Sequence, residues 1–317
     1  MKHRLLLFIG ALLVAASAGA QTYGLATLPP GALQNALSSV IGKTVQDHSK
    51  LQIRVQGYGG DAAVLDAAAH KNSDFFALDV TEAADAYLGR GNWNGKRRES
   101  LRTAITMWGF QVALFARQDS AIRTIADVKG KRVPSAWVQQ TGANQLMAAT
   151  LAAGNLTIKD VQAFPVVNVV RAADDFKAGK LDVFFFAVGA PKVQEVASSV
   201  GGVRLLPYDN TPEVLKRMQA VRPEYYLTEV KPAPHIVGID KPVWVHTFDF
   251  IVGVGSHVPE AAVYDFVKAV HGNKKDLIAG HPGFNQFNPA NAAKPQPTLP
   301  YHPGAIRFYK EAGIWRD

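Results

Sequence analysis

The sequence contains no cysteine among its 317 residues. It therefore has no disulfide and no thiol nucleophile, and its core alone must stabilise the fold, which a chain of this length can do as two lobes. Without cysteine there is also no residue to carry a lipid anchor. The N-terminal segment described next predicts export, and since nothing covalent would then hold the protein at a membrane, we expect an outer membrane to retain it, in a Gram-negative periplasm.

Long apolar runs are scarce. The one near the N-terminus is flanked by residues that are typical of a targeting signal. Residues 1–20 have a basic start, an apolar centre from Leu5 to Ala16 and small residues before Gln21. This pattern is typical of a secretory signal peptide cleaved after Ala20. The alternative, a membrane anchor, needs about 20 apolar residues and a stop-transfer flank. No later segment is apolar enough to span a bilayer.

Signatures of catalysis, metal binding and nucleic-acid binding are missing too. The nine histidines are scattered, and neither an HExxH nor a GxSxG motif occurs. We expect no enzyme activity, no metal and no cofactor, with a hydrolase using a pair such as His246 and Asp249 as the open alternative. The net charge of +8 has its densest patch at Lys96, Arg97 and Arg98, in a polar loop, so nucleic acid is not expected as a partner.

The chain does contain a regular alternation of β-rich runs with helical patterns. Phe164 to Glu195 is the clearest unit, a strand, a short helix stopped by Gly179 and the apolar run Val183 to Val188. Similar units precede it, and Pro303 to Ala312 is expected to be the last helix. Alternation at this spacing predicts an α/β fold in which mostly parallel sheets are flanked by helices.

Loops that follow the strands supply the candidate ligand-binding residues, because small molecules bind beyond the carboxyl ends of strands, near helix N-termini. Arg171 is the best single candidate for an anionic group, although it could instead pair with Asp174 or Asp175. Asp79 has two readings as well, a helix cap or a ligand contact. The full set is Thr27, Tyr58, Gly59, Gly60, Asp79, Trp108, Gln139, Gln140, Thr141, Asn168, Arg171 and Phe186.

Three segments together resemble the TAXI family, the solute receptors of one class of TRAP transporters. They are DSAIRTIADVKGKRV at residues 119–133, DDFKAGKLDVFFFAVGAPKVQE at 174–195 and LPYHPGAIRFYKEAGIW at 299–315. The resemblance implies a two-lobed periplasmic binding protein fold of type II with its ligand in the cleft between the lobes. We expect lobe 1 to comprise residues 21–117 and 249–317, and lobe 2 residues 118–248.

By the same resemblance, the protein is expected to deliver a small anionic solute, bearing a carboxylate, to a TRAP permease driven by an ion gradient. We also expect a monomeric periplasmic receptor with no direct membrane anchor. A receptor for an ABC importer and a sensory relay protein are the alternatives. The chain departs from the family pattern in its glycine loops, with Leu25 to Gly31 and Trp137 to Gly142 in their place. The identity of the solute therefore does not follow.

Overall fold

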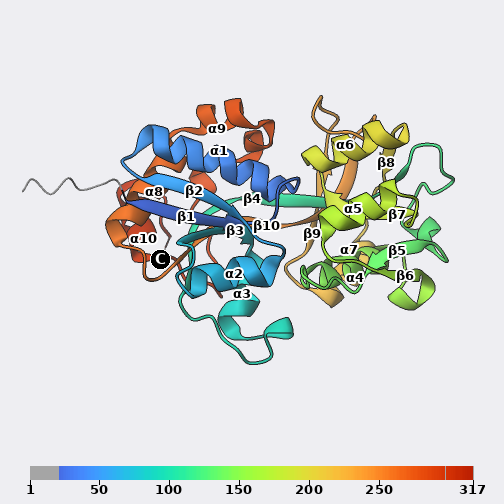
Figure 1. Cartoon of the computed structure of the whole chain (residues 1–317), viewed down its shortest axis with the longest axis horizontal. Helices are drawn as coiled ribbons and strands as arrows, with labels where there is room; N and C mark the ends of the chain where they lie inside the picture. The colour runs from blue at the N-terminus through green and yellow to red at the C-terminus, as the bar shows by residue number, and fades with distance from the viewer. Residues whose placement is uncertain (1–20, 297, 317) are drawn as a thin grey trace, which may run out of the picture.

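The computed structural model describes residues 21–296 and 298–316. The signal peptide predicted at residues 1–20 lies outside the described part. Figure 1 shows two lobes, one formed by the N-terminal and C-terminal segments and the other by the middle of the chain. Two long strands, β4 (Leu101–Arg117) and β10 (Val243–Gly255), run from one lobe into the other.

A mixed eight-stranded sheet connects the two lobes. Its central order is β2-β1-β3-β10-β4-β7, with β8 paired to the end of β4 and β9 to the start of β10. β10 runs antiparallel to β3, β4 and β9, so the sheet is mixed and the predicted mostly parallel arrangement is wrong. The other strands of this sheet are β1 (Thr22–Thr27), β2 (Gln52–Gly57), β3 (Phe75–Asp79), β7 (Val183–Ala187), β8 (Val203–Leu205) and β9 (Tyr226–Val230).

Parallel pairing occurs in both lobes. In lobe 1, β1 pairs in parallel with β2 and β3. In lobe 2, β5 (Arg132–Ser135) and β6 (Gln162–Pro165) form a separate parallel pair. The α/β character that the sequence predicts is therefore confirmed.

Helices cover the strands in each lobe (Figure 1). Those of lobe 1 are α1 (Leu33–His48), α2 (Asp61–Ala69), α3 (Val80–Leu88), α8 (Glu260–Gly272), α9 (Lys274–Gly280) and α10 (Pro303–Glu311). Those of lobe 2 are α4 (Ala143–Ala153), α5 (Val169–Lys177), α6 (Pro191–Val200) and α7 (Pro212–Val221). Short 3-10 turns occur at Gly91–Trp93, Ala126–Val128, Ile158–Asp160, Pro282–Gln286 and Pro289–Asn291.

The chain changes lobe inside its two long strands. Along β10, residues 243–247 pair with β9 of lobe 2, whereas residues 250–254 pair with β3 of lobe 1. Along β4, residues 112–116 pair with β7 of lobe 2. The sequence suggests a break at Gly109, but the strand continues through it. A Cβ there would lie 2.5 Å from the Tyr226 hydroxyl, so this glycine permits a close approach between β4 and β9.

Buried apolar runs form the core of each lobe. All five residues of β3 and all five of β7 are buried, as expected of central strands covered on both faces. In lobe 1, Phe75 stacks on Phe266 of α8, with ring centroids 4.1 Å apart. In lobe 2, Phe184 packs against Phe115 and Phe176 at 5.2 Å and 4.7 Å. Each lobe is thus packed as a unit around its own part of the sheet.

Local predictions succeed where the pattern is strong and fail near prolines. The last helix, α10, is confirmed with one residue fewer than predicted. Between residues 221 and 243 we expect coil, yet β9 lies there and pairs with β10, because a partner strand supplies hydrogen bonds that local sequence does not reveal. The run from Ile125 to Lys129, which ends before Gly130, predicts a short helix, but the structure has only a 3-10 turn at Ala126–Val128.

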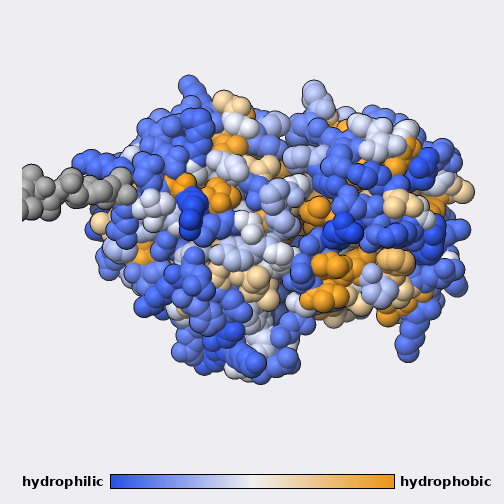
Figure 2. Space-filling view, viewed as in Figure 1, coloured by the Kyte–Doolittle hydropathy of each residue, from blue (hydrophilic) through white to orange (hydrophobic). Residues whose placement is uncertain are grey.

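No helix in the described part of the chain is long and apolar enough to cross a membrane. Figure 2 shows a mostly polar surface with apolar areas on lobe 2. The exposed large apolar residues there are Val138, Ile158 and Val167.

Candidate functional site

A small cavity of about 30 Å³ lies at the junction of the two lobes. Its walls come from the starts of α1 and α2 and the end of β3 in lobe 1, from the starts of α4 and α5 and from β7 in lobe 2, and from the two crossing strands. The lining residues are Gln34, Asp61, Leu78, Asp79, Phe110, Val112, Gln140, Gly142, Ala143, Leu146, Val169, Phe185, Phe186, Ala187 and Phe248.

Two acidic side chains reach this cavity from helix starts in lobe 1. Asp61 is the first residue of α2, directly after Gly60. Asp79 ends β3 and caps α3, since its Oδ1 accepts hydrogen bonds from the backbone N–H groups of Thr81 and Glu82 at 2.7 Å and 2.9 Å. Asp79 is therefore the helix cap that one of its two readings predicts, and because it also lines the cavity, its contact with a ligand stays a prediction.

Glycines let the two lobes touch beside the cavity. A Cβ on Gly60 would lie 1.6 Å from the backbone oxygen of Gln139, so only glycine fits this approach. The Asn168 amide of lobe 2 donates to the carbonyl of Gly59 at 3.4 Å. A Cβ on Gly142 would lie 2.5 Å from the carboxyl carbon of Glu82. The structure is therefore a closed arrangement of the lobes.

A buried ion pair also joins the lobes. Arg222, at the end of α7 in lobe 2, places Nη1 2.9 Å from Oδ2 of Asp85 on α3. Its Nη2 donates to the carbonyl of Thr81 at 3.0 Å. Asp85 is approached on its other oxygen by Arg90 at 3.1 Å, so its charge is fully matched.

The remaining carboxyl groups have no such partner. Burial raises the pKa of Asp61 to about 8; the Asp79 carboxyl adds to the rise and the Gly142 N–H opposes it. Burial also raises the pKa of Asp79. The pKa of Glu82 lies well above its usual range because of burial and because Asp79, Asp61 and Asp85 face it. The site is thus rich in acidic groups that resist ionisation when it is closed and empty.

Several residues predicted from sequence come together here. Asp79, Gln140 and Phe186 line the cavity. Gly59, Gly60, Gln139 and Asn168 form the adjoining contact between lobes. Thr27 and Tyr58 lie in lobe 1 next to this contact, where the Tyr58 N–H donates to the Thr27 carbonyl at 2.8 Å, and Thr141 precedes Gly142.

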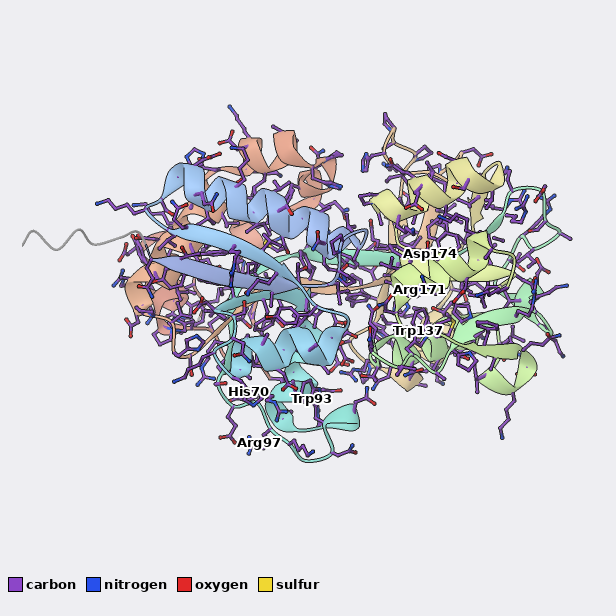
Figure 3. All side chains as sticks on the ribbon, in the orientation of Figure 1. His70, Trp93, Arg97, Trp137, Arg171 and Asp174 are labelled. Atoms are coloured by element: carbon purple, nitrogen blue, oxygen red, sulfur yellow. The ribbon has the colours of Figure 1, made fainter. Side chains whose placement is uncertain are left out.

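Two predicted residues lie elsewhere. Trp108 packs edge-on against Phe250 and Phe284, at 5.5 Å and 5.3 Å, and does not line the cavity. The Arg171 side chain is 60% exposed, with Nη1 3.7 Å from Oδ2 of Asp174. Figure 3 shows both side chains on α5. This is the surface pairing that stood as the alternative for Arg171.

Sequence reasoning missed most of the charged groups at the junction. Gln34 and Asp61 do carry a signal, since each lies in the first turn of a helix that follows a strand and a glycine-containing loop. Glu82 and Asp85 look like ordinary acidic residues of a short helix. Arg222 meets Asp85 from 137 residues away, which no local pattern announces. In the described residues no cluster of histidine and acidic side chains suited to a metal ion is found.

Two α/β lobes joined by two strands, with a cavity at their junction, define the periplasmic binding protein fold. More specifically, the chain belongs to the NMT1-like family, whose model matches residues 31–313.

Solved structures agree with this fold. PhnD1 from Prochlorococcus marinus, in complex with methylphosphonate, aligns with a TM-score of 0.58 over 93% of this chain and 100% of its own, at 9% identity. AbpA from Streptococcus pneumoniae, an amino acid ABC transporter substrate-binding protein bound to L-arginine, gives 0.52 over 84% and 95%, at 9% identity. A binding component of an ABC phosphonate transporter from Pseudomonas aeruginosa gives 0.51 over 85% and 80%, at 11% identity.

Proposed function

We propose that the protein is a monomeric periplasmic solute receptor, which traps a small molecule between its lobes and delivers it to a membrane permease. The observation that carries this proposal is the cavity, because both lobes and both crossing strands contribute to its walls. Polar groups at the N-termini of helices from both lobes meet in an otherwise apolar pocket, which is the usual composition of a ligand site. The role is binding and delivery rather than catalysis.

An ABC importer is the favoured partner. Two of the similar structures, AbpA and the Pseudomonas aeruginosa protein, are named as components of ABC transporters. The alternative, a TRAP permease, is supported by the three segments that resemble the TAXI family, above all LPYHPGAIRFYKEAGIW. A transport assay in membrane vesicles distinguishes the two partners, since an ABC importer needs ATP and a TRAP permease needs an ion gradient.

The charge of the solute is a second question. The sequence predicts an anion, and the complex of PhnD1 with methylphosphonate is a precedent in this fold. An anion needs free cationic or N–H groups, but Arg222 is already paired with Asp85 and Arg171 is at the surface. The Gly142 N–H faces Asp61. An anionic solute is therefore the less favoured candidate.

Ligand binding to the purified protein tests the receptor role. Because a ligand that binds only the folded state stabilises it by mass action, we expect a rise in melting temperature with at least one small solute from a panel of anions, zwitterions and cations. Small-angle scattering should show the radius of gyration falling as the lobes close. A protein that responds to no member of such a panel, and whose lobes do not move, would not be a receptor of this kind.

A further inference from the structure

The acidic groups at the cavity lack positive partners. Asp61, Asp79 and Glu82 are all buried, yet in the part of the chain that the structure describes no Lys, Arg or His nitrogen lies within 4.0 Å of their carboxylates. A buried carboxylate without a partner is costly, so such groups either take up protons or are matched by a cation from outside. In the closed, empty site the charge of Arg222 offsets this cost only in part at Asp79 and Glu82, and no cation is among the groups that shift the pKa of Asp61.

A second observation comes from the opposite wall of lobe 1. Gln34, in the first turn of α1, lines the cavity and is only 9% exposed. Its carboxamide forms no hydrogen bond with any of the described residues, although buried polar groups are almost always hydrogen-bonded. A ligand that donates hydrogen bonds would satisfy this group.

Both observations call for the same kind of ligand. We propose that the cavity holds the cationic head group of a small solute, an ammonium or amidinium group, between the carboxylates of Asp61 and Asp79 and the carboxamide oxygen of Gln34. This inference rests on the proposed receptor function and names its ligand class.

The size and walls of the cavity fit a head group of this kind. Its volume of about 30 Å³ exceeds the ~10–15 Å³ that a single water molecule needs, so the closed lobes leave room for a small polar group such as an ammonium. Leu146, Phe185 and Phe186 provide apolar surface for the carbon atoms next to the charge. A longer solute would hold the lobes slightly further apart.

The competing explanation is an anion that accepts hydrogen bonds from protonated carboxyl groups. The two explanations make opposite predictions for ligand charge. Suitable probes are methylammonium, ethylammonium, 1,4-diaminobutane and methylguanidinium, set against acetate, propionate, succinate and methylphosphonate.

The decisive experiment measures binding of these eight probes to the purified protein by thermal shift and calorimetry. We expect at least one cationic probe to bind and the anionic probes not to bind. Asp61→Asn and Asp79→Asn should each weaken the cation roughly 30-fold or more, since each removes a buried charge pair. Asparagine keeps the cap at residue 79, so this variant should fold. Gln34→Leu should weaken binding roughly threefold to tenfold.

Asp66→Asn is the matched control, because Asp66 lies on α2 with Asp61 but pairs with Arg98 outside the cavity. It should leave the affinity unchanged. Binding of anions but not cations, or cation binding that survives both aspartate substitutions, would overturn the cation site while leaving the receptor function intact. Failure of every probe and of the wider solute panel would overturn both.

Discussion

Lobe 1 brings carboxyl groups to the cavity without a cation of its own, whereas lobe 2 brings apolar side chains, the amide of Gln140 and the loop that closes against Gly60. The guanidinium that lobe 2 brings to the junction, that of Arg222, is paired with Asp85. The comparison separates two tasks. Under the proposed cation site, lobe 1 selects the charge of the ligand, and lobe 2 supplies the loop and the guanidinium that contact lobe 1 in the closed arrangement.

The same contrast extends to protons. Lobe 2 has a buried histidine, His246, on the part of β10 that pairs with β9, and burial lowers its pKa to about 3. In lobe 1, burial instead raises the pKa of Asp61 to about 8. Burial therefore favours the neutral forms of His246 in lobe 2 and Asp61 in lobe 1, so falling pH costs stability at His246 and rising pH costs stability at Asp61.

The largest effect is expected from blocking the contact between lobes. Gly60→Ala would place a Cβ against the Gln139 carbonyl only when the lobes close, since the φ of Gly60, −175°, is an ordinary extended value. We expect ligand affinity to fall by about 3 kcal/mol or more, the upper range for overpacking, with little change in folding. Calorimetry and scattering would measure the two effects.

Gly59→Ala is the matched control for this change. Its Cβ would meet only the end of the Gln139 side chain, which can rotate away. Affinity should remain within a few-fold of the parent. Equal losses in both variants would show that the contact at Gly60 is not specific to closure.

Removing the ion pair between lobes should have the next largest effect. Arg222→Met keeps the apolar stem but leaves Asp85 with only Arg90. We expect closure to weaken by about 2 kcal/mol, because a buried charge loses one partner while water still reaches it when the lobes are open. The ligand dissociation rate reports this cost, and an unchanged rate would mean that the pair forms equally well in both states.

His246 predicts a loss of stability in acid. The pKa of His246 is about 3 in the folded state and about 6.5 in the unfolded state. Below pH 6.5 the unfolded state therefore binds a proton that the folded state does not bind, which lowers the free energy of unfolding. The cost at pH 5.5 is about 1.4 kcal/mol. His246→Phe should remove this part of the difference in unfolding free energy between pH 7.5 and pH 5.5, measured in urea. Opposing contributions from Asp61 and Glu82 stay in both proteins and cancel in the comparison.

The smallest effect is expected at Arg171. Because the guanidinium is exposed and its partner Asp174 lies 3.7 Å away, Arg171→Ala should cost about 0.5 kcal/mol or less in stability and leave ligand affinity within twofold. A loss of several kcal/mol in affinity would return Arg171 to the binding site and restore the case for an anionic ligand.

The sequence predicts the position of the site better than its chemistry. Asp79, Gln140 and Phe186 are found at the cavity because they follow or end strands, and strand ends gather at one edge of a sheet. The same reasoning favours Arg171. A side chain in the first turn of a helix can point either to the cleft or to solvent, however, and the local sequence does not distinguish the two orientations. Arg222 and Asp85 meet only because two lobes close, which requires knowledge of the whole fold.

Local sequence patterns also predict only part of the sheet. Apolar runs identify β3 and β7 directly, since both are buried along their whole length. The direction of β10 between β3 and β4 depends on long-range pairing, so the mixed sheet is not visible in local patterns. β9 is short and lies among prolines, and its pairing with β10 makes it a strand.

The pH dependence of ethylammonium affinity tests the central claim most directly. The carboxyl groups that line the cavity are those of Asp61 and Asp79, with Glu82, Asp85, Arg222 and Tyr225 around them. A cation binds the ionised carboxylates, so we predict that affinity rises between pH 6 and pH 9 and that binding takes up no proton. Affinity that falls over this range, with proton uptake on binding, would contradict a cation site.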